Sequence, residues 1–69
     1  MWIWTEEGST AVNLNRMVMM HIVHEAVAVA VIAHDDLNRP CVLKLCDSEE
    51  EARKFVARLM ISVNSGENP

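Results

Sequence analysis

The pattern of apolar and polar positions is most informative between Met17 and Ala33. This stretch contains three polar residues, His21, His24 and Glu25, and is otherwise apolar. Seven of its residues are β-branched and its V-A-V-A-V core repeats with a period of two, so the pattern favours strands over a helix. The stretch is also longer than a typical strand. We therefore predict two strands with a break at His24 and Glu25, and a single bent strand and a helix are the alternatives.

The second half of this stretch, residues 26–33, is apolar at both sets of alternating positions. Neighbouring strand residues such as Val29 and Ala30 point to opposite faces of a sheet, so neither face of this strand suits water. We expect the helix of the chain to cover one face and a second chain to cover the other, although the pattern leaves the hairpin register open. The residues expected to divide between the core and a homo-oligomer interface are Met17, Met19, Met20, Val27, Val29, Val31 and Ile32.

The N-terminal residues predict a β-hairpin. Residues 2–5 form a short strand that carries two tryptophans, and residues 10–14 form the returning strand. Between them lies Gly8, which adopts a positive φ in a turn without steric cost. The first two strands are therefore expected to pair with each other.

The last predicted strand carries both cysteines of the chain. It follows the turn-forming residues 35–40 and spans residues 41–46. Alternation predicts one apolar face and one mixed face, formed by Cys41, Leu43 and Leu45 and by Val42, Lys44 and Cys46, respectively. The two cysteine Cα atoms lie ~16 Å apart along one strand, whereas a disulfide requires less than about 7 Å. We expect both thiols to be buried and reduced.

The C-terminal helix has the clearest sequence signals. Ser48 and Glu51 have the S-x-x-E spacing of a capping box, in which each side chain accepts a hydrogen bond from a backbone N–H at the helix start. Two ion pairs at i, i+4 spacing are expected in the favourable orientation, Glu49 with Arg53 and Glu50 with Lys54. The helix has one apolar stripe, formed by Ala52, Phe55, Val56, Leu59, Met60 and Val63. Such a stripe covers one face of a sheet.

These elements predict an α+β fold with the order β-β-β-β-β-α. We expect a small, mostly antiparallel sheet of about five strands with one C-terminal helix packed on one face. Residues 1–63 form the single domain and residues 64–69 a flexible C-terminal tail.

The order of motifs resembles that of small bacterial proteins of uncharacterised function. The resemblance rests on a tryptophan-bearing first strand, a turn with glycine, the segment V-N-L-N-R-M, the apolar strands and the S-E-E-E-A start of the helix. In those proteins a sheet precedes one C-terminal helix. The resemblance implies this fold and no activity, so it assigns no functional residue.

Composition indicates which kinds of binding partner and which cellular location to expect. The 69 residues contain 6 Lys and Arg against 10 Asp and Glu, for a formal charge of −4. This balance disfavours binding to nucleic acid, which requires basic residues along the phosphate backbone. The N-terminus lacks the pattern of a signal peptide, and no apolar run reaches the ~18 residues of a membrane span. We therefore expect a soluble cytoplasmic protein without a membrane partner.

Three histidines and two cysteines are candidate zinc ligands, but their spacing is unfavourable. On strands, His21 and His24 point to opposite faces, and so do Cys41 and Cys46. His34 and Cys41 meet across the last hairpin at best, which provides two ligands where a structural zinc site requires four. The sequence also lacks a glycine-rich phosphate loop and a nucleophile motif. We expect no metal, no cofactor and no enzymatic activity.

The leading functional hypothesis is a non-enzymatic, homo-oligomeric interaction module, with a dimer favoured. The dimer would form through the second face or the edge of the sheet. The alternative is a small regulatory domain that binds nucleic acid or a small ligand through Trp2 and Trp4, with Asn13 and Asn15 nearby. A third hypothesis is an accessory subunit whose partner is a different, unidentified protein.

Overall fold

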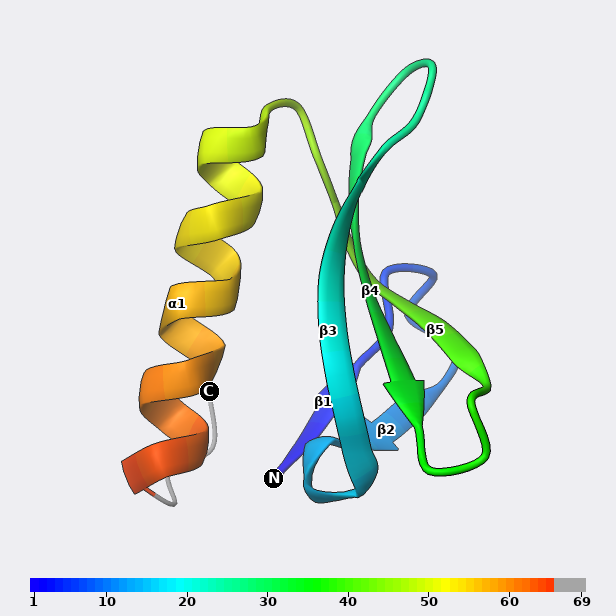
Figure 1. Cartoon of the computed structure of the whole chain (residues 1–69), viewed down its shortest axis with the longest axis vertical. Helices are drawn as coiled ribbons and strands as arrows, with labels where there is room; N and C mark the ends of the chain where they lie inside the picture. Colours follow the sequence, from blue (N-terminus) through cyan, green and yellow to red (C-terminus); the bar gives the residue numbers. More distant parts are fainter. Residues whose placement is uncertain (66–69) are drawn as a thin grey trace.

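The computed structural model describes residues 1–65 and has the predicted α+β architecture (Figure 1). Its five strands form two antiparallel sheets, β1 with β2 and β3–β4–β5, so the predicted strands divide between two sheets. The elements are β1 (Trp2–Trp4), β2 (Ala11–Asn13), the 3-10 turn η1 (Leu14–Arg16), β3 (Met17–His24), β4 (Val29–Asp35), β5 (Pro40–Cys46) and α1 (Glu49–Ser65).

The long apolar stretch forms two strands, as predicted. β3 ends at His24 and β4 begins at Val29, and the Glu25 N–H donates to the carbonyl of Ala28 at 2.8 Å to close the turn between them. Val27 lies at the tip of this turn and is 95% exposed. The break at the polar residues is therefore confirmed, and the helical alternative is wrong for this segment.

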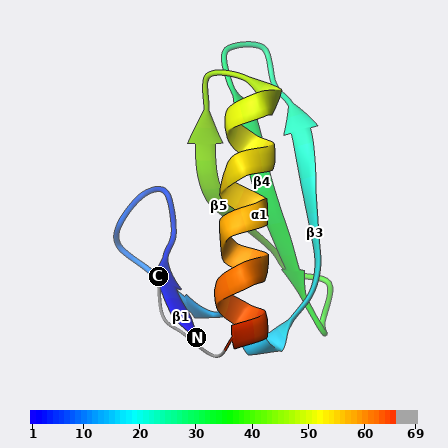
Figure 2. The same ribbon diagram turned by 90° about the vertical axis from the view of Figure 1, so that its left-hand side faces the viewer.

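The helix packs against one face of the three-stranded sheet. Figure 2 shows α1 in front of this sheet, with β3 and β5 on either side of it. Along the central strand, Val29, Val31 and Ala33 point toward the helix and are buried. The buried core comprises Leu14, Val29, Val31, Ala33, Leu43, Cys46, Ala52 and Leu59. Each strand of this sheet contributes at least one residue that contacts the core, as expected for a single sheet face under an amphipathic helix.

The start of α1 has a capping box, displaced by one residue on one side. The Glu51 N–H donates to Ser48 Oγ at 3.3 Å, and the Glu51 carboxylate accepts from the N–H of Asp47 at 3.0 Å, where Ser48 was expected. Both predicted ion pairs form, Arg53 with Glu49 at 2.9 Å and Lys54 with Glu50 at 3.3 Å. The helix runs through Ser65, two residues past the predicted domain end at 63. The remainder of the predicted tail, residues 66–69, lies outside the described residues.

The predicted alternation along β5 is wrong after Leu43. A register shift between Val31 and Ile32 of β4 inserts one extra residue into β5, which is a β-bulge. Cys46 consequently lies in the core, whereas Leu45 is 46% exposed on the opposite face. The two cysteines pair with β4 residues four positions apart, so both lie on the helix side and not on opposite faces. Both thiols are free, as predicted, but only Cys46 is buried, whereas Cys41 is partly exposed.

The N-terminal hairpin forms as predicted and lies beside the β5 edge. Gly8 has φ of 75° in the connecting loop. Ile3 and Val12 pack against the core, while Trp2 and Trp4 on the outer side of β1 are 63% and 66% exposed. The returning strand is shorter than expected, because Leu14 begins the turn η1.

Two substitutions test the docking of α1. Leu59 is 3% exposed, so Leu59→Ala should lower the free energy of unfolding by about 2–5 kcal/mol. Ser48→Ala removes the N-cap acceptor and should cost about 1 kcal/mol. The control Ile61→Ala alters a side chain that is 68% exposed and should cost less than about 0.5 kcal/mol. Urea denaturation at one fixed protein concentration measures all three, and equal losses for Leu59→Ala and Ile61→Ala would contradict the proposed packing.

Candidate functional site

The face of the three-stranded sheet that points away from α1 is the candidate site, and we call it the open face. The strand register aligns its residues in three rows across β3, β4 and β5. The rows are Met19–His34–Pro40, His21–Ile32–Val42 and Val23–Ala30–Leu45. Seven of these nine side chains are apolar, and the other two are histidines.

The open face combines apolar chemistry with exposure to solvent. Met19 and Leu45 are each 46% exposed and Val42 is 39% exposed, at opposite edges of the face. Ala30 is 1% exposed because it is small and lies on the central strand between larger neighbours. No formal charge lies among the nine residues. Because solvent-exposed sheet faces usually carry polar side chains, a face of this composition indicates a contact surface.

The two histidines of the open face lie against each other. His21 and His34 are diagonal neighbours on adjacent strands, with 3.2 Å between their Nε2 atoms. Their rings are nearly perpendicular, with centroids 4.9 Å apart. One ring nitrogen must donate and the other accept if the two share a hydrogen bond. The Nδ1 atom of His34 is buried, so Nε2 is the nitrogen that this ring presents at the surface.

Sequence reasoning missed this histidine pair. The expected partner of His34 was Cys41, but Cys41 pairs with Ala33 and therefore points to the opposite face. The turn at 25–28 pairs residue 24 with residue 29, and this register carries His21 to the diagonal of His34. The polar break at His24 and Glu25 was the sequence signal that could have predicted the pair. A turn placed there sets the register between β3 and β4, and this register brings His21 close to His34.

The seven residues predicted to divide between core and interface lie in three parts of the structure. Val29 and Val31 lie in the core under α1, whereas Ile32 and Met19 lie on the open face. Val27 belongs to neither group, since it lies at the hairpin tip. Met17 and Met20 pack against the core from β3. Val42 and Leu45 also lie on the open face, and sequence reasoning did not include them, because the bulge in β5 moves Leu45 there.

A methionine-rich groove separates β3 from the C-terminal half of α1. It encloses about 530 Å³ and is lined entirely by apolar side chains. The lining residues are Leu14, Met17, Val18, Met19, Met20, Val56, Met60 and Val63. Met19 also belongs to the open face, so this groove adjoins that face along β3.

The third histidine has a different role from the other two. His24 Nε2 lies 2.7 Å from Glu49 Oε1 and links the end of β3 to the start of α1. The hydrogen bonds from His24 and Arg53 lower the pKa of Glu49. This contact lies on the helix side, so His24 is separated from the open face by the sheet. Within residues 1–65, no three His, Cys, Asp or Glu side chains are grouped as a metal site.

The two cysteines lie in surroundings that suppress thiolate chemistry. Burial raises the pKa of Cys41 and of Cys46, and the nearby carboxylates of Glu7 and Glu51, respectively, raise it further. The thiolate is the nucleophile and the metal ligand, so both thiols are held in the less reactive form at neutral pH.

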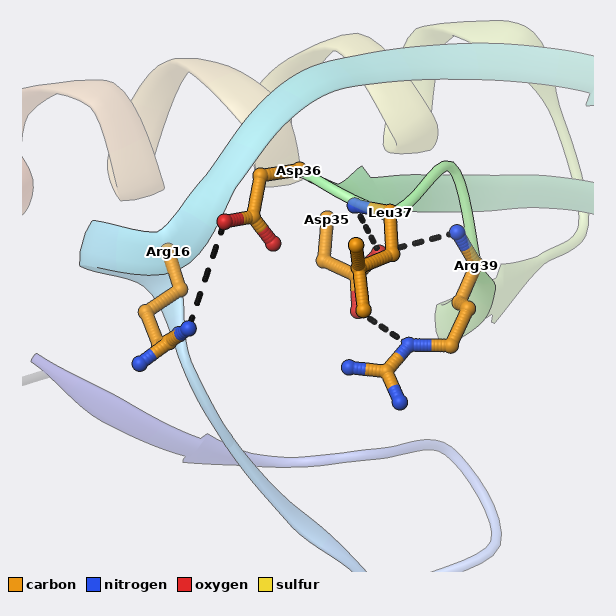
Figure 3. A network of polar contacts seen from close by, with 5 residues as sticks. All are labelled: Arg16, Asp35, Asp36, Leu37 and Arg39. Carbon is orange, nitrogen blue, oxygen red and sulfur yellow. Dashed lines mark hydrogen bonds and ion pairs between the residues drawn. The ribbon is translucent and has the colours of Figure 1, made fainter.

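The turn after β4 depends on one carboxylate. Asp35 accepts hydrogen bonds from the N–H groups of Leu37 and Arg39, each at 2.9 Å, and from Arg39 Nε at 2.7 Å (Figure 3). The backbone N–H of Arg39 is the main reason that the pKa of Asp35 is lowered. Asn38 has φ of 60° in this turn, a conformation that Asn tolerates better than most residues. This turn fixes where β5 begins and therefore which residues it presents on the open face.

Comparison with known proteins gives no further guide to function. No family model, curated protein or solved structure matches the chain. Within residues 1–65, no helix has both the length and the apolar character needed to cross a membrane.

The lowered pKa of Asp35 predicts a pH-dependent contribution to stability. A carboxyl whose pKa is lower in the folded state stabilises the protein above its ordinary pKa, and the stabilisation is lost as pH falls through the folded-state pKa. Asp35→Asn should therefore lower the urea midpoint at pH 7, and the difference from wild type should shrink below about pH 4. Asp36→Asn is the control, because Asp36 makes an exposed ion pair with Arg16 at 4.0 Å. A difference for Asp35→Asn that is constant with pH would contradict this role.

Proposed function

We propose that the chain is a non-enzymatic interaction module that forms a homodimer through the open face of its three-stranded sheet. The observation that carries the proposal is the uncharged, largely apolar composition of nine aligned residues, of which Met19, Val42 and Leu45 are large, apolar and exposed. The helix packs on the other face and does not cover them. A second copy of the chain covers them.

The size of the open face supports a weak dimer. Three strands about 4.8 Å apart and three rows about 6.7 Å apart span roughly 14 by 20 Å, or about 300 Å² in projection. Patches of this size on monomers are often functional. Two such faces bury about 600 Å² in projection, below the ~1,200 Å² at which standard interfaces begin. We therefore expect a weak dimer whose population rises with protein concentration.

The chemistry and symmetry of the open face suit a second copy as the occupant. Its nine residues carry no formal charge, so two copies can stack them without placing like charges directly opposite each other. The acidic residues Glu6 and Glu7 lie at its β5 margin, beside Val42 and Leu45. The same surface contacts itself in such a dimer, as a two-fold axis requires.

The face is a better candidate than the strand edges. On the β5 side, the Glu6 N–H donates to the Val42 carbonyl at 3.2 Å and the Glu6 carboxylate accepts from the Leu45 N–H at 2.9 Å, which blocks that edge. On the β3 side, an irregularity between Met17 and Met19 disturbs the start of the edge, while residues 19–24 are regular. Bulges and covered edges both oppose pairing with another strand. Edge pairing would also leave the open face uncovered.

The exposed tryptophans support a second candidate function. Trp2 and Trp4 lie on the same side of β1 and offer two aromatic surfaces, which suit base stacking or a small aromatic ligand. Glu6 and Glu7 lie two and three residues after Trp4, so the electrostatic attraction that nucleic acid needs is weak there. Salt-dependent retention on a single-stranded nucleic-acid column that is lost in Trp4→Ala would favour this function over the dimer.

A cytoplasmic location is part of the proposal. The two free cysteines support it, because reducing compartments keep thiols unpaired.

Val42→Lys tests the dimer. Val42 lies in the middle row of the open face at 39% exposure, so a lysine there has water available in the monomer and is desolvated in the dimer. We expect the dissociation constant of the dimer to rise at least tenfold, measured by sedimentation equilibrium, with a melting temperature within a few degrees of wild type in dilute solution.

Val27→Lys is the matched control. It introduces the same substitution at the hairpin tip, where Val27 is 95% exposed and lies outside the three rows of the open face. It should associate as wild type does. A wild-type protein that stays monomeric at high micromolar concentration, or equal association of both variants, would overturn the proposal.

A further inference from the structure

The histidine pair of the open face has the spacing of two ligands on one metal ion. Two nitrogens bound to a tetrahedral zinc ion at 2.0–2.1 Å lie about 3.3–3.4 Å apart. The Nε2 atoms of His21 and His34 lie 3.2 Å apart. Imidazole nitrogen is a preferred ligand of zinc, copper and nickel. The pair therefore has the nitrogen separation that one such ion requires.

The strands hold this pair in place. His21 and His34 lie on adjacent, hydrogen-bonded strands, so the separation of their Cα atoms is set by the sheet and not by a loop. The buried Nδ1 of His34 leaves Nε2 as the nitrogen directed toward His21. A ligand pair on a sheet loses less conformational freedom on binding than one on a flexible segment.

One copy of the chain provides half of a tetrahedral site. The remaining seven residues of the open face include no carboxylate, thiol or third imidazole. His24 is separated from the pair because it contacts Glu49 on the helix side. Two further ligands must therefore come from outside the protomer.

In the proposed dimer, the spacing between the two stacked sheets allows histidines from both copies to reach one metal ion. Stacked sheets lie about 10 Å apart, so each protomer contributes about 5 Å, roughly the reach of an imidazole side chain. A two-fold axis that passes over the pair places it against its own copy. Two copies then offer four imidazole nitrogens around one point in an apolar, water-poor surface.

We propose that His21 and His34 bind a divalent transition-metal ion, zinc above all, in a four-histidine site that two copies of the chain complete together. The proposal rests on the open-face dimer and adds a metal ion to it. Metal binding and dimerisation would then strengthen each other. It departs from the expectation of no metal, which treated His34 as a neighbour of Cys41 and His21 as isolated.

Zinc titration of the EDTA-treated, dialysed protein tests the site. Calorimetry should give half an equivalent of zinc per chain, and sedimentation equilibrium should show that the dissociation constant of the dimer falls at least tenfold with zinc. His21→Gln and His34→Gln should each weaken zinc binding more than tenfold. His24→Gln is the matched control and should bind zinc as wild type does, because its ring lies on the other side of the sheet.

The two proposals fail separately in this experiment. A protein that dimerises in EDTA but takes up no zinc overturns the metal site and leaves the dimer intact. A monomer in EDTA that stays monomeric with zinc overturns both. One equivalent of zinc per chain without a change in mass, or retention of zinc by both His21→Gln and His34→Gln, also overturns the four-histidine site. Val42→Lys is an independent test, because it disrupts the dimer but retains both histidines. This variant should no longer bind half an equivalent of zinc per chain.

Discussion

The structure depends on one constraint, which is that the central strand β4 is apolar on both faces. Val29, Val31 and Ala33 point toward α1, and Ala30 and Ile32 point away from it. The described part of the chain has a single helix to cover this sheet, and it occupies one face. The other face is thus left apolar, with Met19, Val42 and Leu45 exposed on the flanking strands. The proposed dimer would cover this apolar surface without a dedicated binding motif.

The small features around β4 all set which residues reach each face. The turn at 25–28 fixes the register of β3 against β4, and the Asp35 carboxylate holds the turn that leads into β5. The bulge in β5 then exchanges the faces of Leu45 and Cys46. A one-residue change in any of these features moves a strand's side chains to the other face. The burial of the Cys46 thiol and the exposure of Leu45 are therefore consequences of the same backbone geometry.

Polar chemistry is separated between the two sides of the sheet. On the helix side, His24 joins β3 to Glu49, where a carboxylate near the helix N-terminus interacts favourably with the helix dipole. On the open face, His21 and His34 are paired with each other and surrounded by apolar side chains. The first contact connects two elements of one chain. The second places two ring nitrogens side by side at the surface proposed to meet another copy. This difference in surroundings distinguishes a structural histidine, His24, from the candidate metal ligands His21 and His34.

The sequence by itself determined the types of the elements, their order along the chain and the residue at which the helix begins. β-branched residues, turn formers and the Ser48–Glu51 spacing act within a few residues, so they can be read directly. Tertiary structure alone decided the division into two sheets, the bulge that buries Cys46, and the meeting of His21 with His34. These depend on register between strands, which is set by packing over long sequence separations. A local pattern shows that β4 has two apolar faces, but the fold decides which one the helix takes.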